Sequence, residues 1–122
     1  MLLTFAGILG FISVAFGAYA EHGLRSSLTP TQFESIMTAV RTHQIHSVLL
    51  AAIGLLSLLK SPISQSPFLR SSGILLIVGM FLFSGSIYLS YTLGIPELKK
   101  AAPWGGICLM LGWLTLAGVG LK

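Results

Sequence analysis

The sequence predicts an all-α integral membrane protein, an antiparallel four-transmembrane-helix bundle in a single domain (residues 1–122). Of its 122 residues, 54% are hydrophobic and only 8% are charged, whereas soluble globular domains carry about 25% charged residues. Charge this sparse cannot cover a water-exposed surface. Four apolar stretches separated by polar breaks each approach the ~20 residues that span a bilayer core: residues 2–20, 38–59, 70–93 and 101–121.

The first stretch resembles a signal peptide because Ala18-Tyr19-Ala20 follows its apolar core. No Lys or Arg precedes that core, although a signal peptide carries basic residues there. We therefore expect a retained transmembrane helix, which Gly23 would end. Small residues at helical spacing on this stretch, Gly10 and Gly17 among them, would let a neighbouring helix approach closely.

The second helix has a clear start signal. Thr29-Pro30-Thr31-Gln32 combines a threonine N-cap, a proline at the first helical position and a glutamine that closes a capping box. Residues 30–40 then form an amphipathic stretch that we expect to lie at the membrane interface. This stretch either bends into the second span or runs straight into it.

Two histidines open that second span. His43 and His46 are three residues apart, so on a helix they share one face. The same face continues through Gly54, which makes it small and polar rather than bulky. Ionisable groups inside a bilayer are costly and need partners. We therefore expect at least one hydrogen bond from His43 or His46 to the first or third span, with Glu21, His22, Tyr88 and Tyr91 as candidate partners.

The third and fourth spans are separated from the rest by polar, proline-containing connectors. The third span carries small residues on two sides, which indicates a helix between two neighbours. Gly94 and Pro96 end it. Trp113 lies well inside the fourth span and needs a packing or hydrogen-bonding role. The glycines expected to allow close helix packing are Gly10, Gly17, Gly54, Gly79, Gly85, Gly105 and Gly112.

The polar ends of the spans are expected to gather on one side of the membrane, because the first and third loops lie on the same side of a four-span topology. The candidate polar cluster consists of Glu21, His22, His43, His46, Ser84, Tyr88 and Tyr91. Three interpretations stay open: a network that fixes helix packing, a metal site, or a relay for protons or small solutes. The favoured one is the packing network, since an H-x-x-H pair on a helix is weak evidence for a metal.

Catalysis has little support in the sequence. No nucleophile, base and orienting group can be recognised together, and the single cysteine, Cys108, lies inside a predicted span. We expect no catalytic residue, no cofactor, no metal ligand set and no enzymatic activity. The net charge of +4 is spread over short loops without a basic run, so no nucleic-acid partner is expected.

Several segments resemble the YgdD-like family of small four-span inner-membrane proteins, a family of unknown function. These segments are residues 16–24, residues 38–41 with His43 and His46, residues 83–88, and residues 103–106 with Gly112 and Trp113. The resemblance covers nearly the whole chain. It implies a multi-pass protein of the bacterial inner membrane and supplies no activity, cofactor or substrate.

Two functional classes remain open. The favoured one is a structural or interaction protein that binds membrane lipids, a second copy of itself or a partner membrane protein. The alternative is an oligomeric transporter or channel component that uses the His, Glu and Tyr cluster. Four spans place both termini on the same side. Three basic side chains on that side against four on the other do not decide which side it is.

Overall fold

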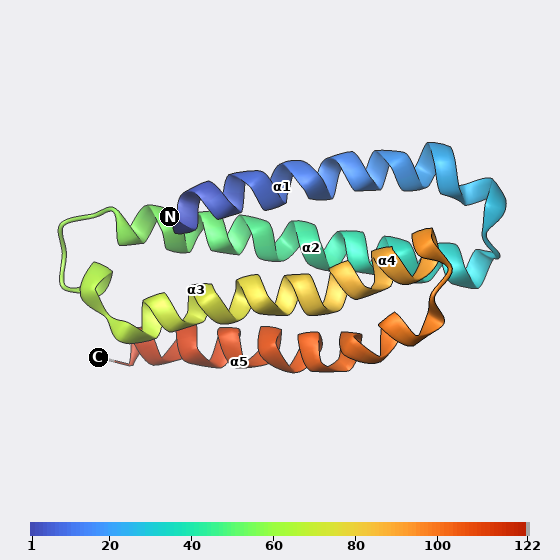
Figure 1. Cartoon of the computed structure of the whole chain (residues 1–122). Helices are drawn as coiled ribbons and strands as arrows, with labels where there is room; N and C mark the ends of the chain where they lie inside the picture. The colour runs from blue at the N-terminus through green and yellow to red at the C-terminus, as the bar shows by residue number, and fades with distance from the viewer. Residues whose placement is uncertain (122) are drawn as a thin grey trace.

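The structure is a computed structural model that describes residues 1–121, and its helices form four long antiparallel rods (Figure 1). Each rod is long and apolar enough to cross a membrane, and in chain order the four are Leu2–Ser27, Pro30–Ser57, Pro67–Leu93 and Pro96–Gly120. The helical segments are α1 (Leu2–Tyr19), η1 (Ala20–Leu24), η2 (Arg25–Ser27), α2 (Pro30–Ser57), η3 (Ile63–Gln65), α3 (Pro67–Met80), η4 (Phe81–Gly85), α4 (Ser86–Leu93), η5 (Pro96–Ala101) and α5 (Ala102–Gly120).

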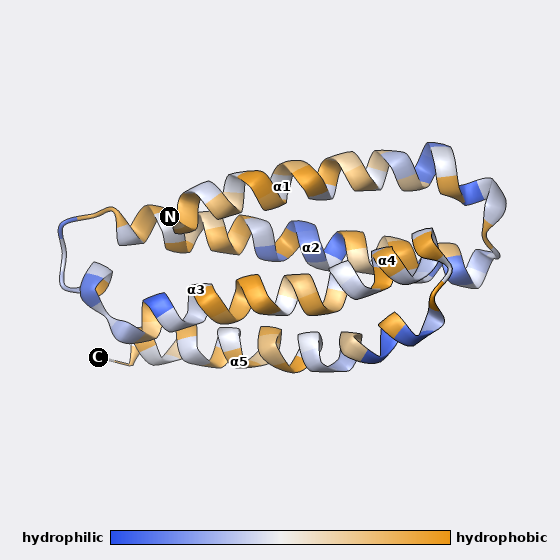
Figure 2. Cartoon of the chain, viewed as in Figure 1, coloured by the Kyte–Doolittle hydropathy of each residue, from blue (hydrophilic) through white to orange (hydrophobic). Residues whose placement is uncertain are grey.

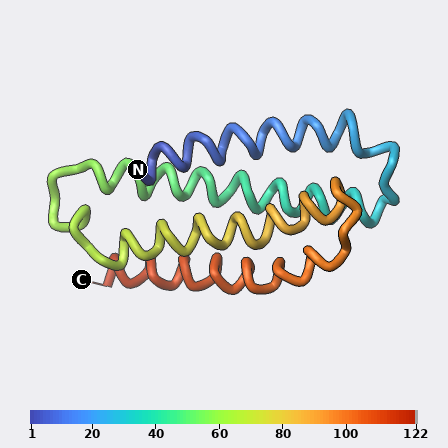
Figure 3. Tube along the Cα trace, in the orientation of Figure 1, coloured from blue at the N-terminus to red at the C-terminus, as the bar shows by residue number. Residues whose placement is uncertain are grey.

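The four rods divide into two hairpins, α1 with α2 and α3–α4 with α5. In Figure 3 the two rods of each hairpin run side by side in opposite directions. The second and third rods are the inner pair, since a larger share of their residues is buried than in the two outer rods. The outer surface is rich in exposed apolar side chains, and Figure 2 shows apolar residues along all four rods. Such a surface fits lipid and would be unstable in water.

The end of the first rod differs from the prediction, and the end of the third rod agrees with it. Gly23 does not end the first rod: it lies inside a π-helical turn, Ala20–Leu24, which keeps the backbone hydrogen-bonded. The rod continues to Ser27, and the chain becomes extended only at Leu28. The prediction of a stop at Gly23 is therefore wrong. A second π-helical turn, Phe81–Gly85, interrupts the third rod, and Gly94 ends that rod in a left-handed conformation, as predicted.

The capping box at the start of α2 is confirmed. The hydroxyl of Thr29 accepts a hydrogen bond from the backbone N–H of Gln32 at 3.2 Å, and the Gln32 side chain accepts one from the N–H of Thr29 at 3.0 Å. From this cap the helix runs unbroken to Ser57. The amphipathic stretch therefore runs straight into the span, which was one of the two alternatives.

Replacing Thr29 with alanine should weaken the first turns of α2 by about 1 kcal/mol, because the backbone N–H of Gln32 loses the hydroxyl that accepts its hydrogen bond. Amide exchange across residues 30–36 should accelerate accordingly. The matched control is Thr31→Ala, at an exposed position whose carbonyl, not its hydroxyl, accepts the local bond from Ser35. Equal exchange rates in the two variants would show that the Thr29 cap does not hold this helix start.

The first hairpin packs through small residues at a seven-residue spacing. An added Cβ at Gly54 would lie 2.7 Å from the backbone nitrogen of Leu3, and one at Gly17 would lie 3.2 Å from Val40. Between these two close contacts along the hairpin, a Cβ at Gly10 of α1 would make an ordinary contact with Ser47 of α2 at 3.8 Å. A repeat of seven is the period of helices that wind around each other with a left-handed twist. Close approach of the two backbones follows from the missing side chains.

The second hairpin also packs closely at positions where a glycine lacks a side chain. A Cβ at Gly79 would lie 2.7 Å from Leu109, and one at Gly112 would lie 2.8 Å from Leu76. A Cβ at Gly105 would collide with the backbone of Phe83. Gly85 differs from the prediction: an added Cβ there meets nothing within 4 Å, because Gly85 lines a recess instead of a helix contact.

Candidate functional site

His46 lies between two fixed partners in the middle of the bundle. The indole N–H of Trp113 on α5 donates to Nε2 of His46 at 3.0 Å, and Nδ1 of His46 lies 2.7 Å from the carbonyl of Thr42. An indole N–H can only donate, so Nε2 must be the acceptor and Nδ1 must carry the proton. His46 is therefore a neutral imidazole in one tautomer, with both nitrogens engaged.

His43 pairs with the third rod. Its Nδ1 lies 3.0 Å from the hydroxyl of Tyr88 on α4, and its side chain is buried, at 4% exposure. The Tyr88 ring stacks on Phe16 of α1 with 3.8 Å between ring centroids. The predicted hydrogen bond from the histidines to the first or third span is thus present. This contact joins the first, second and third rods at one point.

Serine hydroxyls complete the connections between rods. Ser84 donates to the carbonyl of Ala39 at 2.8 Å, and so links η4 to α2. Ser72 donates to the carbonyl of Gly112 at 2.8 Å and links α3 to α5. Ser47 donates to the carbonyl of His43 one turn earlier. The polar stretch in the middle of α2, visible in Figure 2, thus contains two side chains, His43 and His46, that bond to side chains on other rods.

Three members of the predicted cluster lie elsewhere. Glu21 is exposed and pairs with Arg25 at 3.1 Å, and His22 is exposed beside it. Tyr91 accepts a hydrogen bond from Lys99 at 2.9 Å near the end of the bundle. In each pair a nearby charged side chain on the surface supplies the partner. The structure brings together His43, Ser84 and Tyr88, and places His46 one turn away with Trp113.

A narrow recess of about 90 Å³ opens beside His43, between α1 and the third rod. Its lining is almost entirely apolar and includes Leu9, Phe81 and Gly85. Nε2 of His43 is buried without a hydrogen-bond partner among the described residues. Within residues 1–121, no group of three His, Cys, Asp or Glu side chains lies close enough together to hold a metal ion.

The sequence did not identify Trp113, Phe16 or Ser72 as members of this network. Trp113 carried a signal: an indole N–H deep in an apolar helix needs an acceptor, and few side chains at that depth can accept. For Phe16 and Ser72 the sequence gives no such signal, since an aromatic ring or a serine is common in a transmembrane helix.

The described geometry is that of a hydrogen-bonded network between the rods, in which both nitrogens of His46 are engaged and one nitrogen of His43 bonds to Tyr88. Comparison with known proteins identifies the family of the chain. A family model described as protein of unknown function (DUF423) matches residues 16–106. No solved structure matches the chain.

Curated relatives cover nearly the full length. The inner membrane protein YgdD of Escherichia coli, a UPF0382 protein, is 35% identical over 96% of this chain and 87% of its own. A UPF0382 membrane protein of Haemophilus influenzae is 31% identical over 94% of this chain and 89% of its own. The UPF0382 membrane protein YwdK of Bacillus subtilis is 25% identical over 100% of this chain and 97% of its own. This chain therefore belongs to the DUF423 family of membrane proteins of unknown function, as the resemblance to YgdD-like proteins predicted.

Proposed function

We propose that this chain is a non-enzymatic interaction protein that assembles with transmembrane helices through the outer face of its first hairpin. The observation that carries the proposal is a shallow groove of about 540 Å³ along α1 and α2, open to the lipid side, which we call the α1–α2 groove. Its lining residues are Ala6, Gly7, Gly10, Phe11, Ser13, Val14, Gln44, Ser47, Val48 and Ala51.

The α1–α2 groove suits a helix better than it suits bulk lipid. An added Cβ at Gly7 would meet nothing within 4 Å, so the floor of the groove is open at that point. Phe11 and Val48 line the groove and are 74% and 72% exposed. Small residues beside exposed larger ones are typical of membrane helix interfaces, where association is driven by close packing.

A polar group in the groove points to the occupant. The side-chain amide of Gln44 lines the groove and makes no hydrogen bond to another side chain within residues 1–121. An amide offers both donors and an acceptor, so it can pair with its own copy across a two-fold axis. The occupant that we propose is a second copy of this chain, docked through the same groove.

Filling the groove tests this proposal. Gly7→Leu should abolish dimers measured by energy transfer between labelled chains in lipid bilayers, while the fold of each chain is unaffected. The matched control is Gly106→Leu on α5, where an added Cβ also meets nothing within 4 Å. Gln44→Leu should weaken the dimer by about 1 kcal/mol, the size of a hydrogen bond between membrane helices. Dimers that survive Gly7→Leu, or a chain that is monomeric to begin with, would refute the proposal.

The transporter alternative has weaker support. Both nitrogens of His46 are engaged by partners within the bundle, so neither is free to contact a transported solute. The recess beside His43 is small and apolar, and an ion or polar solute would lose its hydration without compensation.

We further propose that the chain lies in the bacterial inner membrane with both termini on the same side. Support comes from the bundle, in which α1 begins and α5 ends at one end (Figure 3), and from relatives that are named inner membrane proteins. Compartment-sensitive reporters fused before Met1 and after Lys122 should report the same compartment. A reporter inserted at Leu98 should report the other one. Opposite results for the two terminal fusions would rule this topology out.

A further inference from the structure

A second surface pocket lies at the far end of the bundle from the start of α1, between the η1–η2 turn and the first half of α2. Its volume is about 470 Å³, and two arginines and two glutamates line it, Glu21, Arg25, Glu34 and Arg41. It shares no residue with the α1–α2 groove. We call it the Arg25–Arg41 pocket.

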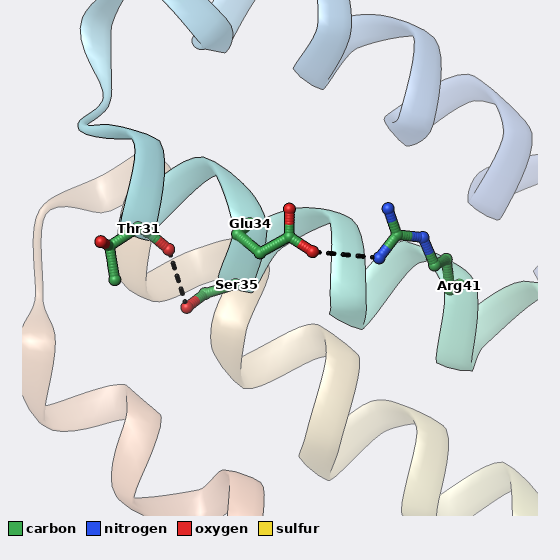
Figure 4. Close-up of polar contacts among 4 residues, drawn as sticks. All are labelled: Thr31, Glu34, Ser35 and Arg41. Carbon is green, nitrogen blue, oxygen red and sulfur yellow. Dashed lines mark hydrogen bonds and ion pairs between the residues drawn. The ribbon is translucent and has the colours of Figure 1, made fainter.

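Both arginines are already held in place. Nη1 of Arg41 lies 3.2 Å from Oε1 of Glu34 (Figure 4). Nη1 of Arg25 lies 3.1 Å from Oε2 of Glu21, and the Arg25 guanidinium stands over the Phe33 ring, 4.7 Å from its centroid. A guanidinium carries five N–H donors in a planar fork, and each ion pair engages one terminal nitrogen. The arginines are 63% and 60% exposed, so their remaining donors can reach a ligand.

The pocket combines these charges with an apolar wall at the depth of the membrane surface. Leu28, Phe33 and Met37 line it together with the charged groups. A hydrocarbon core ~30 Å thick corresponds to ~20 helical residues. Counted back along α2 from Ser57, this length places the boundary near Met37, between Glu34 and Arg41. Glu34 thus lies on the headgroup side of the boundary and Arg41 about one helical turn inside it, and the apolar side chain of Met37 lies between them, at the level where a headgroup meets its acyl chains.

We propose that the Arg25–Arg41 pocket binds a phospholipid whose headgroup carries a phosphate and a primary ammonium, as phosphoethanolamine does. The phosphate would lie against the two guanidinium groups, which suit its geometry. The ammonium would donate to the carboxylates of Glu21 and Glu34.

Charge balance selects this headgroup over others. Two positive and two negative side chains match a headgroup with one charge of each sign, whereas a purely anionic headgroup would meet both carboxylates at close range. A choline headgroup has no N–H to donate to a carboxylate. The inference is independent of dimer formation.

The test uses the purified full-length chain in phosphatidylcholine nanodiscs that contain either phosphatidylethanolamine or phosphatidylglycerol. Lipid retained by the protein is then measured by native mass spectrometry. The unaltered chain should retain phosphatidylethanolamine in preference to both other lipids. Arg41→Gln should lower that retention about tenfold, the loss of one charge-assisted hydrogen bond. Lys100→Gln, at the same end of the bundle but outside the pocket, should leave it unchanged.

The Glu21→Gln/Glu34→Gln double variant separates charge recognition from general damage. It leaves two uncompensated arginines, so the preference should shift from phosphatidylethanolamine to phosphatidylglycerol, which a partly unfolded chain would not show. The same preparations report dimers, so failure of the lipid preference with dimers intact overturns only this inference. No preference in the unaltered chain, or no shift in the double variant, would overturn it. Displacement of the lipid by inorganic phosphate or free phosphoethanolamine alone would overturn the assignment to a lipid.

Discussion

A methyl group added at Gly105 is expected to destabilise the bundle by about 3 kcal/mol or more, at the upper end of what overpacking costs. The added carbon would lie 2.7 Å from the carbonyl carbon of Leu82 and from Cα of Phe83. Those are backbone atoms of the π-helical turn Phe81–Gly85. A flexible side chain could rotate away, but this backbone can retreat only if the whole rod moves.

The free energy of unfolding of Gly105→Ala, measured by denaturant titration in mixed micelles, checks this expectation. The matched control is Gly85→Ala, also in a helical rod, where the added methyl meets nothing within 4 Å. Because alanine favours a helix over glycine by up to about 1 kcal/mol, the control should be neutral or stabilising. Gly105→Ala should therefore lower the free energy of unfolding, whereas Gly85→Ala should leave it unchanged or raise it. Similar losses in both would mean that helix contact at Gly105 is not what the fold depends on.

Removal of the Tyr88 hydroxyl should have the second-largest effect. Tyr88→Phe keeps the ring that stacks on Phe16, and it removes the only side-chain partner of His43 among the described residues. Since Nε2 of His43 also lacks a partner, the variant would bury an imidazole without a hydrogen bond. That costs about 1–3 kcal/mol.

Two further variants identify the cause. Tyr91→Phe removes a hydroxyl bonded to the exposed Lys99, and should change the free energy of unfolding by well under 1 kcal/mol. The double variant His43→Leu/Tyr88→Phe removes both buried partners, so it should be less unstable than the sum of its single variants. Additive losses would show that the two side chains do not stabilise each other.

The sequence predicted the architecture because the signals for it are local. Span length and hydropathy define the four rods, and the Thr29 capping box depends on neighbouring residues alone. The bond from His43 to Tyr88 was also within reach, because a buried imidazole needs a partner and topology limits the choice to a few side chains.

What the sequence could not predict depends on competition between partners. Glu21 pairs with Arg25, four residues along the same rod, although topology alone also allowed it to reach the histidines. For His46 the proposed partners on the first and third spans were wrong, since the Trp113 indole on the fourth span occupies its Nε2. Such choices depend on the rotation of each rod about its axis, which a repeat of small residues constrains only loosely.

The π-helical turn Phe81–Gly85 has a consequence for how this chain tolerates insertion and deletion. Such a turn holds one residue more than an α-helix would place there, and each α-helical residue turns the chain by about 100°. The turn therefore absorbs that extra residue locally and leaves Tyr88 on nearly the same face as an uninterrupted α-helix with one residue fewer would. Loss of one residue within the turn would convert it to an α-turn and keep Tyr88 facing His43, whereas loss of one residue within α3 would swing Tyr88 by about 100°. Within this rod, the π-helical turn is thus the place where a one-residue deletion is best tolerated.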